Sequence, residues 1–487
     1  MRGCPSAERA KPFRATSQDG STIDTTAIQG LRLVTAALPV EGARPEALLR
    51  DAAGKPRGFW ARGERWVAHA GVLARVVVEG GADRFRRVQR EADALVQQVV
   101  PTEGSDARLI GRLRWYGGFA FAADHRAAEY WAAHPSALFI LPRVELVGDA
   151  DGTGRLRIRA PMDEGDDPER VRDGLMEELE AIRGRLERAA APGGEWGPTG
   201  TTRDEIDRGV WDATVRDGLA RIEAGQFSKV VLARTLDVTP GTPLDPVDVA
   251  LTLWEENKGT HVFLFEPAEG RALVGAAPET IATLRKGVFH CTAVAGSTRR
   301  GESQEESERL ARELLDSEKD RAEQRMVVDD VVERLEPLCE GIRVQDEPHV
   351  LSLTRIQHLE TEIRARTSPG RHVLELLEAL HPTPAVCGLP RDEALRFLQD
   401  EEPFHRGWYA GPVGWFDRDG DGVFAPALRT AVSRESRWRL FAGAGIVRGS
   451  TTEAEWEETL IKFEPVIRAL DAVAAGVRGP GGAAGRE

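Results

Sequence analysis

The sequence holds few cysteines, and none of them stands in a metal-binding or disulfide-forming pattern. Cys4, Cys291, Cys339 and Cys387 are scattered over 487 residues without a CxxC pair. Cysteines scattered in this way are typical of reduced thiols. The sequence therefore argues against both a disulfide framework and a cysteine-based zinc site.

Long apolar runs and an excess of basic charge are also missing. No uninterrupted apolar stretch reaches the roughly 18 residues that a membrane-spanning helix requires, and residues 1–20 lack the apolar core of a secretory signal. The formal net charge is −14, whereas proteins that bind nucleic acid present basic faces. We therefore expect a cytoplasmic protein with neither a membrane nor a nucleic-acid partner. An anionic ligand would need local positive charge in its site.

Composition divides the chain into four segments. Residues 1–26 are polar and are predicted to be mobile, and the Gly/Ala-rich residues 473–487 are predicted to form a disordered tail. A Gly/Pro/Thr-rich connector near residues 190–203 separates two halves. We assign residues 27–202 a structural role, because no catalytic constellation occurs there. Residues 203–472 are predicted to carry the chemistry.

Short strands with turn residues alternate with a few long helical stretches. We expect hairpins over residues 58–80 and 137–160, the second turning around Asp149–Gly154. Strands are separated by both turns and helices, with little βαβ rhythm. The sequence therefore predicts an α+β fold, with large antiparallel sheets in a sandwich flanked by helices. The longest predicted helices cover residues 168–191, 204–224, 303–338 and 453–475.

Two stretches resemble cofactor motifs but depart from them. DRDGDG at Asp417–Gly422 matches the first half of a calcium loop, but the twelfth position is Leu428 where the loop needs a glutamate. We expect a hairpin turn there instead. FAGAGIVRG resembles a dinucleotide fingerprint, but Arg448 replaces the last glycine. Gly443 and Gly445 are expected to mark a strand that another group approaches closely.

Several polar residues of the second half admit two interpretations. Lys229, in the strand SKVVLAR, is typical of a solvated face, although a desolvated lysine serves as a general base. Glu279 follows a proline at a strand end, and Glu323 lies on a charge-rich helix where surface pairing is usual. Glu455 and Glu458 share one face near the start of a helix, where the helix dipole stabilises negative charge. Their placement therefore needs no functional explanation.

Two further considerations favour a site. Carboxylates from separate helices can converge on Mg2+, which takes a few carboxylates together with water and substrate oxygens. Arg429 lies in the apolar stretch VFAPALRTAV. A guanidinium on a central strand needs a partner, and a planar substrate carboxylate fits it bidentately. Residue types and spacing alone leave both interpretations open.

Taken together, these segments resemble the chorismate-utilising enzyme family, and isochorismate synthases in particular. The matching segments occur in the family's order, at matched intervals, and cover most of residues 205–470. The resemblance implies a sandwich fold of the anthranilate-synthase type. The segments are FSKVVLAR, GAAPET, VAGSTRRG, SEKDRAEQ, LHPTPAVCG, YAGPVGWFD, ALRTAV and FAGAGIVRGSTTEAEWEET.

The resemblance implies a Mg2+-dependent isomerisation of chorismate to isochorismate. Lys229 would activate the water that attacks C2 of the ring, and Glu279 would protonate the C4 hydroxyl as it leaves. Glu323, Glu458 and Glu455 would hold Mg2+ directly or through water, and the metal would grip the ring carboxylate. Such a reaction needs a base and an acid with opposite protonation preferences on separate elements.

The resemblance also implies a set of substrate contacts. Arg429 and Tyr409 would contact the enolpyruvyl carboxylate. With Mg2+ and Lys229, Arg429 would supply the positive charge that a dianion needs in an acidic protein. The remaining residues implied to line the pocket are Ala385, Val386, Leu428, Phe441, Gly443 and Gly445.

Members of the family differ in what they add and what they release. The anthranilate-type, ammonia-using members carry Gln where Lys229 stands, so we expect water chemistry and no glutaminase partner. Salicylate synthases share the lysine and then eliminate pyruvate, and they are the main alternative. The N-terminal half resembles the longer isochorismate synthases of menaquinone synthesis in the segment FWARGERWVAHAGVLARV. Siderophore synthesis stays open as the alternative pathway.

Two departures from the family pattern are visible. AEQR replaces a more usual His after Glu323, and Val386 stands where Leu is frequent. The first departure keeps the Glu323 carboxylate, and the second could change how the pocket packs around the substrate ring. A chorismate binder without catalysis is a further alternative. It is disfavoured because Lys229 and the metal glutamates are all present.

Overall fold

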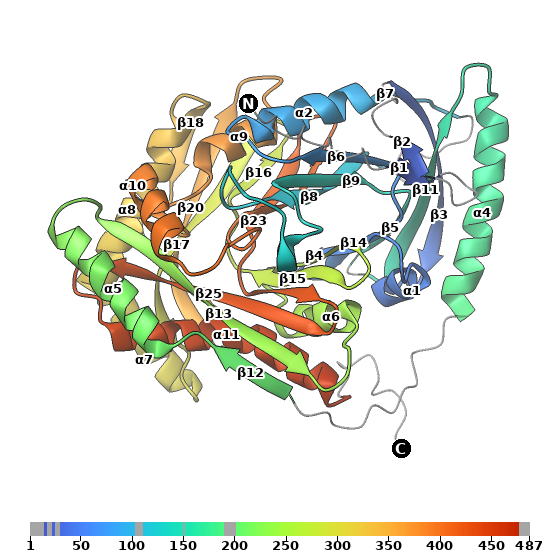
Figure 1. The fold of residues 1–487 in the computed structure, drawn as a ribbon. Helices are drawn as coiled ribbons and strands as arrows, with labels where there is room; N and C mark the ends of the chain where they lie inside the picture. Colours follow the sequence, from blue (N-terminus) through green and yellow to red (C-terminus); the bar gives the residue numbers. More distant parts are fainter. Residues whose placement is uncertain are drawn as a thin grey trace, which may run out of the picture.

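The computed structural model describes residues 14–16, 22–24, 30–102, 111–149, 151–188 and 201–476. The predicted mobile N-terminus lies outside them except for β1 (Arg14–Thr16) and β2 (Thr22–Asp24), which pair with each other. Most of the predicted connector and tail also lies outside. Two large sheets face each other, with helices on their outer faces (Figure 1).

The larger sheet contains strands from both halves of the chain. Its order is β12-β13-β25-β24-β15-β14-β4-β5-β10-β11-β3-β7, with β21 beside β13, and β3 and β7 pair in parallel. Its strands are β3 (Leu31–Glu41), β4 (Arg57–Arg62), β5 (Arg65–Ala70), β7 (Val96–Val99), β10 (Val144–Gly148), β11 (Thr153–Met162), β12 (Thr201–Glu205), β13 (Lys229–Pro240), β14 (His261–Ala268), β15 (Arg271–Ala277), β21 (Gly388–Leu389), β24 (Thr430–Arg434) and β25 (Arg437–Val447).

The smaller sheet is antiparallel and also draws on both halves. Its order is β18-β20-β17-β16-β23-β22-β8-β9-β6, with β19 beside β20. Since both sheets mix strands of the two halves, the strand order does not separate a structural from a catalytic half, and that division stays a prediction. Its strands are β6 (Ala74–Val78), β8 (Arg114–Phe119), β9 (Ala137–Leu141), β16 (Ala282–Arg285), β17 (Val288–Arg299), β18 (Cys339–Val344), β19 (His349–Ser352), β20 (Ile356–Thr367), β22 (Pro412–Asp417) and β23 (Gly422–Pro426).

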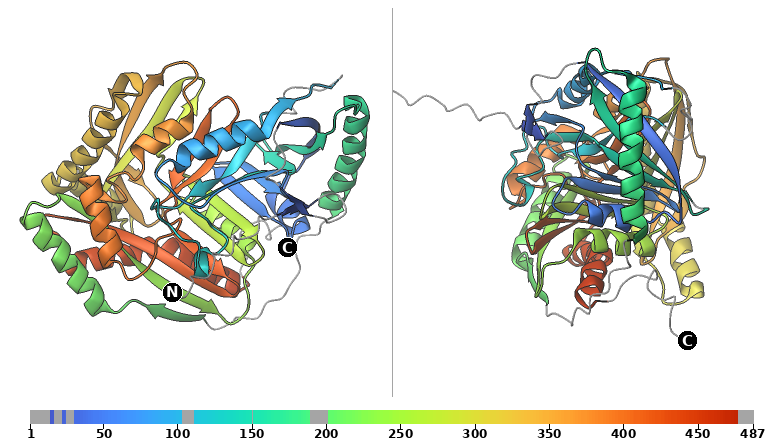
Figure 2. Two further views of the ribbon diagram at one scale, coloured as in Figure 1. Left: turned by 45° about the horizontal axis from the view of Figure 1, so that its top comes forward. Right: turned by 90° about the vertical axis from the view of Figure 1, so that its right-hand side faces the viewer.

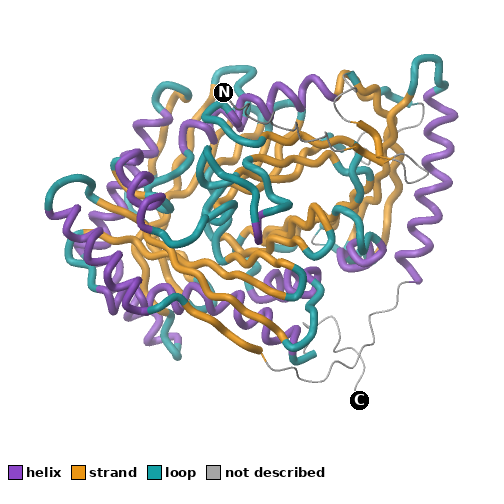
Figure 3. Tube along the Cα trace, viewed as in Figure 1, coloured by secondary structure: helices purple, strands orange, loops and turns teal. Residues whose placement is uncertain are grey.

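Helices cover both outer faces (Figure 3). In the described chain, α1, α4, α5, α6 and α11 pack on the larger sheet, and α2, α8 and α9 on the smaller one. Figure 2 shows α4 standing against the N-terminal strands. The helices are α1 (Pro45–Asp51), α2 (Arg84–Leu95), η1 (Glu129–Trp131), α4 (Pro168–Arg188), α5 (Arg208–Glu223), α6 (Pro246–Glu256), α7 (Gln304–Asp316), α8 (Glu318–Leu335), α9 (Val373–Leu380), α10 (Arg391–Glu401) and α11 (Thr452–Ala474).

This architecture confirms the predicted α+β sandwich, but the first hairpin differs from the expectation. Strands β4 and β5 form a hairpin in the larger sheet, whereas β6 joins the smaller sheet and pairs with β9. Gly71 adopts a left-handed backbone at the crossing, a conformation that favours glycine. Val76 and Val78 are fully buried in the core of the smaller sheet. The chain therefore crosses between layers at this point.

Two predicted helices also begin or break at unexpected places. The stretch 303–338 forms α7 and α8, because the Ser317 side chain accepts a hydrogen bond from the backbone N–H of Asp320 and starts a new helix. The helix predicted over 204–224 begins at Arg208, since the residues before it form the edge strand β12. The predicted turn at Asp417–Gly422 is confirmed as the link between β22 and β23, and Arg112 bridges Asp417 and Asp421 there.

Two predicted absences can be compared with the described residues. Within them, no helix is both long and apolar enough to cross a membrane. Cys291, Cys339 and Cys387 are free and buried, and Cys4 lies outside the described residues.

Candidate active site

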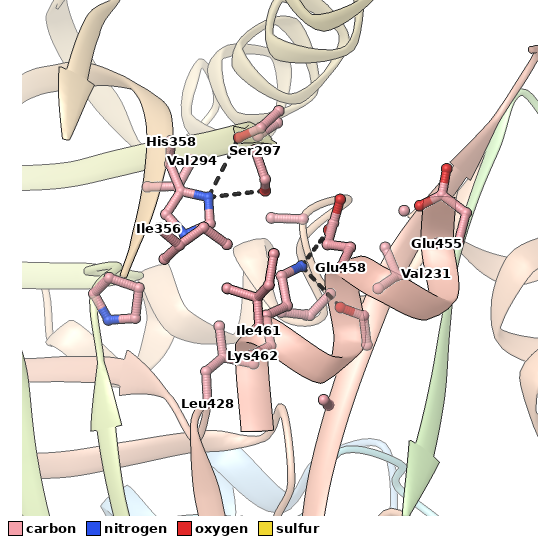
Figure 4. A pocket seen from close by; sticks show the side chains of 18 of the residues that line it. Val231, Val294, Ser297, Ile356, His358, Leu428, Glu455, Glu458, Ile461 and Lys462 are labelled. Atoms are coloured by element: carbon pink, nitrogen blue, oxygen red, sulfur yellow. Dashed lines mark hydrogen bonds and ion pairs between the residues drawn. The ribbon is translucent and has the colours of Figure 1, made fainter. Parts of the chain in front are cut away.

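A cavity of about 460 Å³ lies between β13 and β25 of the larger sheet and β17 and β20 of the smaller one, beside α8 and α11 (Figure 4). All residues predicted to form the site line it, although they come from widely separated segments. They are Lys229, Glu279, Glu323, Ala385, Val386, Tyr409, Leu428, Arg429, Phe441, Gly443, Gly445, Glu455 and Glu458.

Lys229 begins β13 and points inward. Its side chain is withdrawn from solvent, with the residue 1% exposed, so the solvated-face interpretation is wrong. Its Nζ lies 2.8 Å from Oε1 of Glu323 on α8. A buried amine needs such a partner because a lone charge is costly away from water.

The two glycines of β25 keep this region open. A Cβ atom on Gly445 would lie 2.9 Å from Glu323 Oε1 and 3.3 Å from Lys229 Cε. A Cβ atom on Gly443 would lie 2.9 Å from the hydroxyl of Tyr409. The sequence expectation of a strand approached closely by other groups is confirmed.

Glu279 follows the end of β15 and is buried. Burial raises the pKa of its carboxyl to about 8, although the nearby charge of Lys229 opposes the shift and Glu360 adds to it. At neutral pH this carboxyl therefore carries a proton that it can donate. Lys229 and Glu279 thus bring an amine and a protonated carboxyl to one cavity.

Four carboxylates at the cavity are close enough to influence one another electrostatically. Burial, followed by the charge of Glu458, raises the pKa of Glu455 to about 7. Burial also raises the pKa of Asp320 on α8, with contributions from Glu323 and Glu458. Such repulsion favours a cation among them. A hard ion such as Mg2+ suits this all-oxygen donor set.

The glutamates do not converge as a closed metal cage. Within the described chain no group of three acidic, His or Cys side chains is placed to hold a metal ion. Glu323 is paired with Lys229, and Glu458 lies 2.5 Å from Lys462 Nζ. The predicted Mg2+ ligands Glu323, Glu455 and Glu458 thus share a cavity, and their role stays a prediction.

The first turn of α11 is firmly anchored. The Thr451 side chain accepts a hydrogen bond from the backbone N–H of Ala454, which caps the helix. Two guanidinium groups stack on the Trp456 ring, with Cζ of Arg234 3.6 Å and Cζ of Arg208 4.9 Å from its centroid. Stacking of this kind is attractive. It fixes the turn that carries Glu455 and Glu458.

Arg429 differs from its predicted strand placement. It lies between β23 and β24 with a left-handed φ of 50°, which is costly for a residue with a side chain. Burial lowers the pKa of its guanidinium to about 10, so the group remains charged at neutral pH. No carboxylate pairs with it in the described part of the chain. The cavity therefore contains an arginine available to an anion.

Apolar groups form the wall beside this arginine. The Tyr409 and Phe441 rings are stacked with centroids 5.0 Å apart. Burial raises the pKa of Tyr409 to about 12, so its hydroxyl keeps its proton. Ala385, Val386 and Leu428 line the same cavity. The wall suits a flat, partly apolar ring.

Sequence reasoning missed several lining residues. His358 accepts from Arg429, and Lys462 donates to the Gly443 carbonyl at 2.8 Å. Figure 4 shows His358 beside Ser297, and Lys462 directed at Glu458. Alternation along IQHLETEI places His358 with Glu360 on the polar positions, opposite Leu359 and Ile363, so the pattern gave no signal for a buried histidine. Lys319 and Asp320 also line the cavity.

Comparisons with known proteins agree with this geometry. Residues 22–471 match the family of chorismate binding enzymes. The chain is 35% identical to the salicylate biosynthesis isochorismate synthase of Pseudomonas aeruginosa, over 81% of this chain and 80% of that protein. It is 30% identical to isochorismate synthase MenF of Bacillus subtilis, over 85% and 88% of the two chains.

A solved structure gives the same picture. The menaquinone-specific isochorismate synthase MenF of Escherichia coli superposes with a TM-score of 0.72 at 25% identity, covering 91% of this chain and 96% of that one. The chain therefore belongs to the chorismate-binding enzyme family, close to its isochorismate synthases.

Proposed function

We propose that the protein is an isomerase that converts chorismate to isochorismate, with water adding at C2 as the C4 hydroxyl leaves. One observation carries the proposal: buried Lys229 and Glu279 line one cavity of about 460 Å³ together with an arginine that has no carboxylate partner in the described chain. In the proposal, the neutral amine of Lys229 serves as the proton acceptor and protonated Glu279 as the proton donor.

The acid and the base have opposite tasks. In its neutral form Lys229 takes a proton from the attacking water, and Glu279, protonated at neutral pH, gives a proton to the departing hydroxyl. Positioned proton transfer of this kind typically contributes about 10²–10⁴-fold to a rate. The exchange is balanced, since one proton is taken up and one is given.

Binding of the dianion relies on the chain's own cations. Arg429 is expected to hold the enolpyruvyl carboxylate in a bidentate contact, with the Tyr409 hydroxyl beside it. The Tyr409–Phe441 stack and the Gly443 backbone are expected to enclose the ring. Positive groups in the cavity offset the repulsion expected from a chain of net charge −14.

We further infer that Glu323, Glu458 and Glu455 hold Mg2+ at this site. The ion would supply positive charge for the ring carboxylate of the substrate. The oxygen-only donor set and the raised pKa of Glu455 support the assignment. Menaquinone synthesis in the cytoplasm is the expected setting, and siderophore synthesis is the alternative.

Salicylate synthesis is the second candidate function. It shares the first step and differs by loss of pyruvate from isochorismate. The name of the Pseudomonas relative refers to salicylate biosynthesis, so a product assay should also look for salicylate.

Chromatography of the products tests the proposal. Purified full-length protein is incubated with chorismate and Mg2+, with and without ammonia. We expect isochorismate as the main product, independent of ammonia. Salicylate and pyruvate as main products would favour the second function, and ammonia-dependent anthranilate would contradict water chemistry.

A further inference from the structure

His358 is a buried histidine at the cavity to which the proposed chemistry assigns no task. It lies on β20, and its ring faces the cavity between two sets of partners. Its Nε2 is 3.1 Å from Nη2 of Arg429. Its Nδ1 is 3.0 Å from the Ser297 hydroxyl and 3.3 Å from the Gly296 carbonyl oxygen.

These partners determine the protonation of the ring. A guanidinium has only N–H donors, so Nε2 of His358 must present a lone pair to Arg429. The Gly296 carbonyl only accepts, so Nδ1 must carry the proton. Both ends therefore assign the same neutral tautomer. Burial, together with the charges of Arg429 and Lys462, holds the pKa of His358 well below its ordinary value.

Arg429 depends on this contact. Among the residues that the structure describes, His358 is the side chain to which its guanidinium hydrogen bonds. Its backbone is held in a left-handed conformation, and the Ala276 N–H donates to its carbonyl at 3.3 Å. The backbone contact fixes the position of the Arg429 main chain, and the hydrogen bond to His358 fixes the position of its guanidinium. The other N–H groups stay available to the cavity.

We propose that His358 is a positioning residue that orients Arg429 for a substrate carboxylate, by accepting one guanidinium N–H on Nε2 while Nδ1–H is held by Gly296 and Ser297. The inference rests on the proposed function in that Arg429 binds chorismate. His358 takes no part in proton transfer with the substrate. In the proposal, His358 contributes equally to the binding free energy of the substrate and of the transition state.

Two variants separate positioning from catalysis. In His358→Ala, Arg429 loses its acceptor, so we expect KM for chorismate to rise about tenfold or more while kcat changes less than about threefold. In His358→Gln, the side-chain oxygen replaces Nε2 as acceptor and should restore most of the KM. A buried histidine away from the cavity, His372, gives the control. His372→Gln should leave KM unchanged.

The outcomes are decisive in both directions. A fall in kcat with unchanged KM in His358→Ala would overturn the inference, and so would a Gln variant as impaired as the Ala variant. Carbon-13 and nitrogen-15 NMR of the labelled histidine ring, assigned by difference with His358→Gln, tests the tautomer without any turnover. A proton on Nε2 in the wild type would contradict the inference. If the wild type does not convert chorismate, the proposed function fails and the ring measurement alone decides on His358.

Discussion

Lys229 and Glu323 form an ion pair of 2.8 Å inside a cavity where the lysine is almost fully buried. The pair joins the first residue of β13 to α8, so the proposed base is held by a proposed metal ligand. A substitution at either residue therefore alters both the charge and the chemistry of the site.

Replacing the amine should remove catalysis and spare the fold. Lys229→Met keeps the length of the side chain without a proton acceptor, and Lys229→Arg keeps the charge but cannot release its proton. We expect kcat to fall by about 10²–10⁴-fold in both variants. Product assays and circular dichroism check this. An active Arg variant would exclude Lys229 as the base.

Removal of the acid should change the alkaline side of the pH profile. Burial raises the pKa of Glu279 to about 8, so the proton that it donates is lost as pH rises through that value. We expect kcat/KM of the wild type to fall above about pH 8 and Glu279→Gln to be severely impaired. A wild-type profile that stays flat to pH 9 would argue against Glu279 as the acid.

The same carboxyl affects stability. Its pKa is higher in the folded chain than the ordinary value of 4.5, so the folded state binds the proton more tightly than the unfolded state. Stability contributed by this proton is full below about pH 4.5 and is lost as pH rises through about 8. Glu279→Gln should therefore gain thermal stability relative to wild type at pH 8.5 and not at pH 5.

A methyl group at Gly445 should disturb the central pair. The added Cβ would lie 2.9 Å from Glu323 Oε1 and would push it from Lys229. Misplacement of about 1 Å can cost about 10²-fold in rate, so we expect a loss of that order in Gly445→Ala. Gly259→Ala is the matched control, because a Cβ there meets open space. Equal activity of the two variants would contradict the account.

Mg2+ should stabilise the folded chain through the glutamates. A ligand that binds only the folded state raises the melting temperature, and the shift grows with the logarithm of the ligand concentration above Kd. We expect MgCl2 to raise the Tm of the wild type, and EDTA to abolish activity. Glu323→Gln and Glu458→Gln should lose the Mg2+-dependent Tm shift. A shift that persists in both variants would place the ion elsewhere.

The residues predicted for the site line one cavity and their roles stay predictions, whereas the path of the chain departs from the prediction in several places. The resemblance to a known family, and not spacing alone, singled out Lys229, Glu279 and the glutamates, and the structure brings them to one cavity. The crossing of β6 into the second sheet depended on how Gly71 turns and which core Val76 enters, and a strand pattern does not specify its layer. Local periodicity could not reveal the break at Ser317 either.

Arg429 and His358 illustrate the limit at the site itself. Arg429 stood out as a charged residue among apolar neighbours, yet its left-handed backbone and its contact with His358 depend on packing between sheets. Its sequence neighbours alone suggested a regular strand. His358 is 71 positions away in the chain. Pairings at such distances arise from topology and are invisible to spacing rules.

Incubation of the wild type with chorismate and Mg2+ in oxygen-18 water tests the central claim most directly. We expect isochorismate that carries one oxygen-18 atom at C2, detected by mass spectrometry, with no accumulation of pyruvate. Isochorismate without the label, or salicylate and pyruvate as the main products, would contradict that claim.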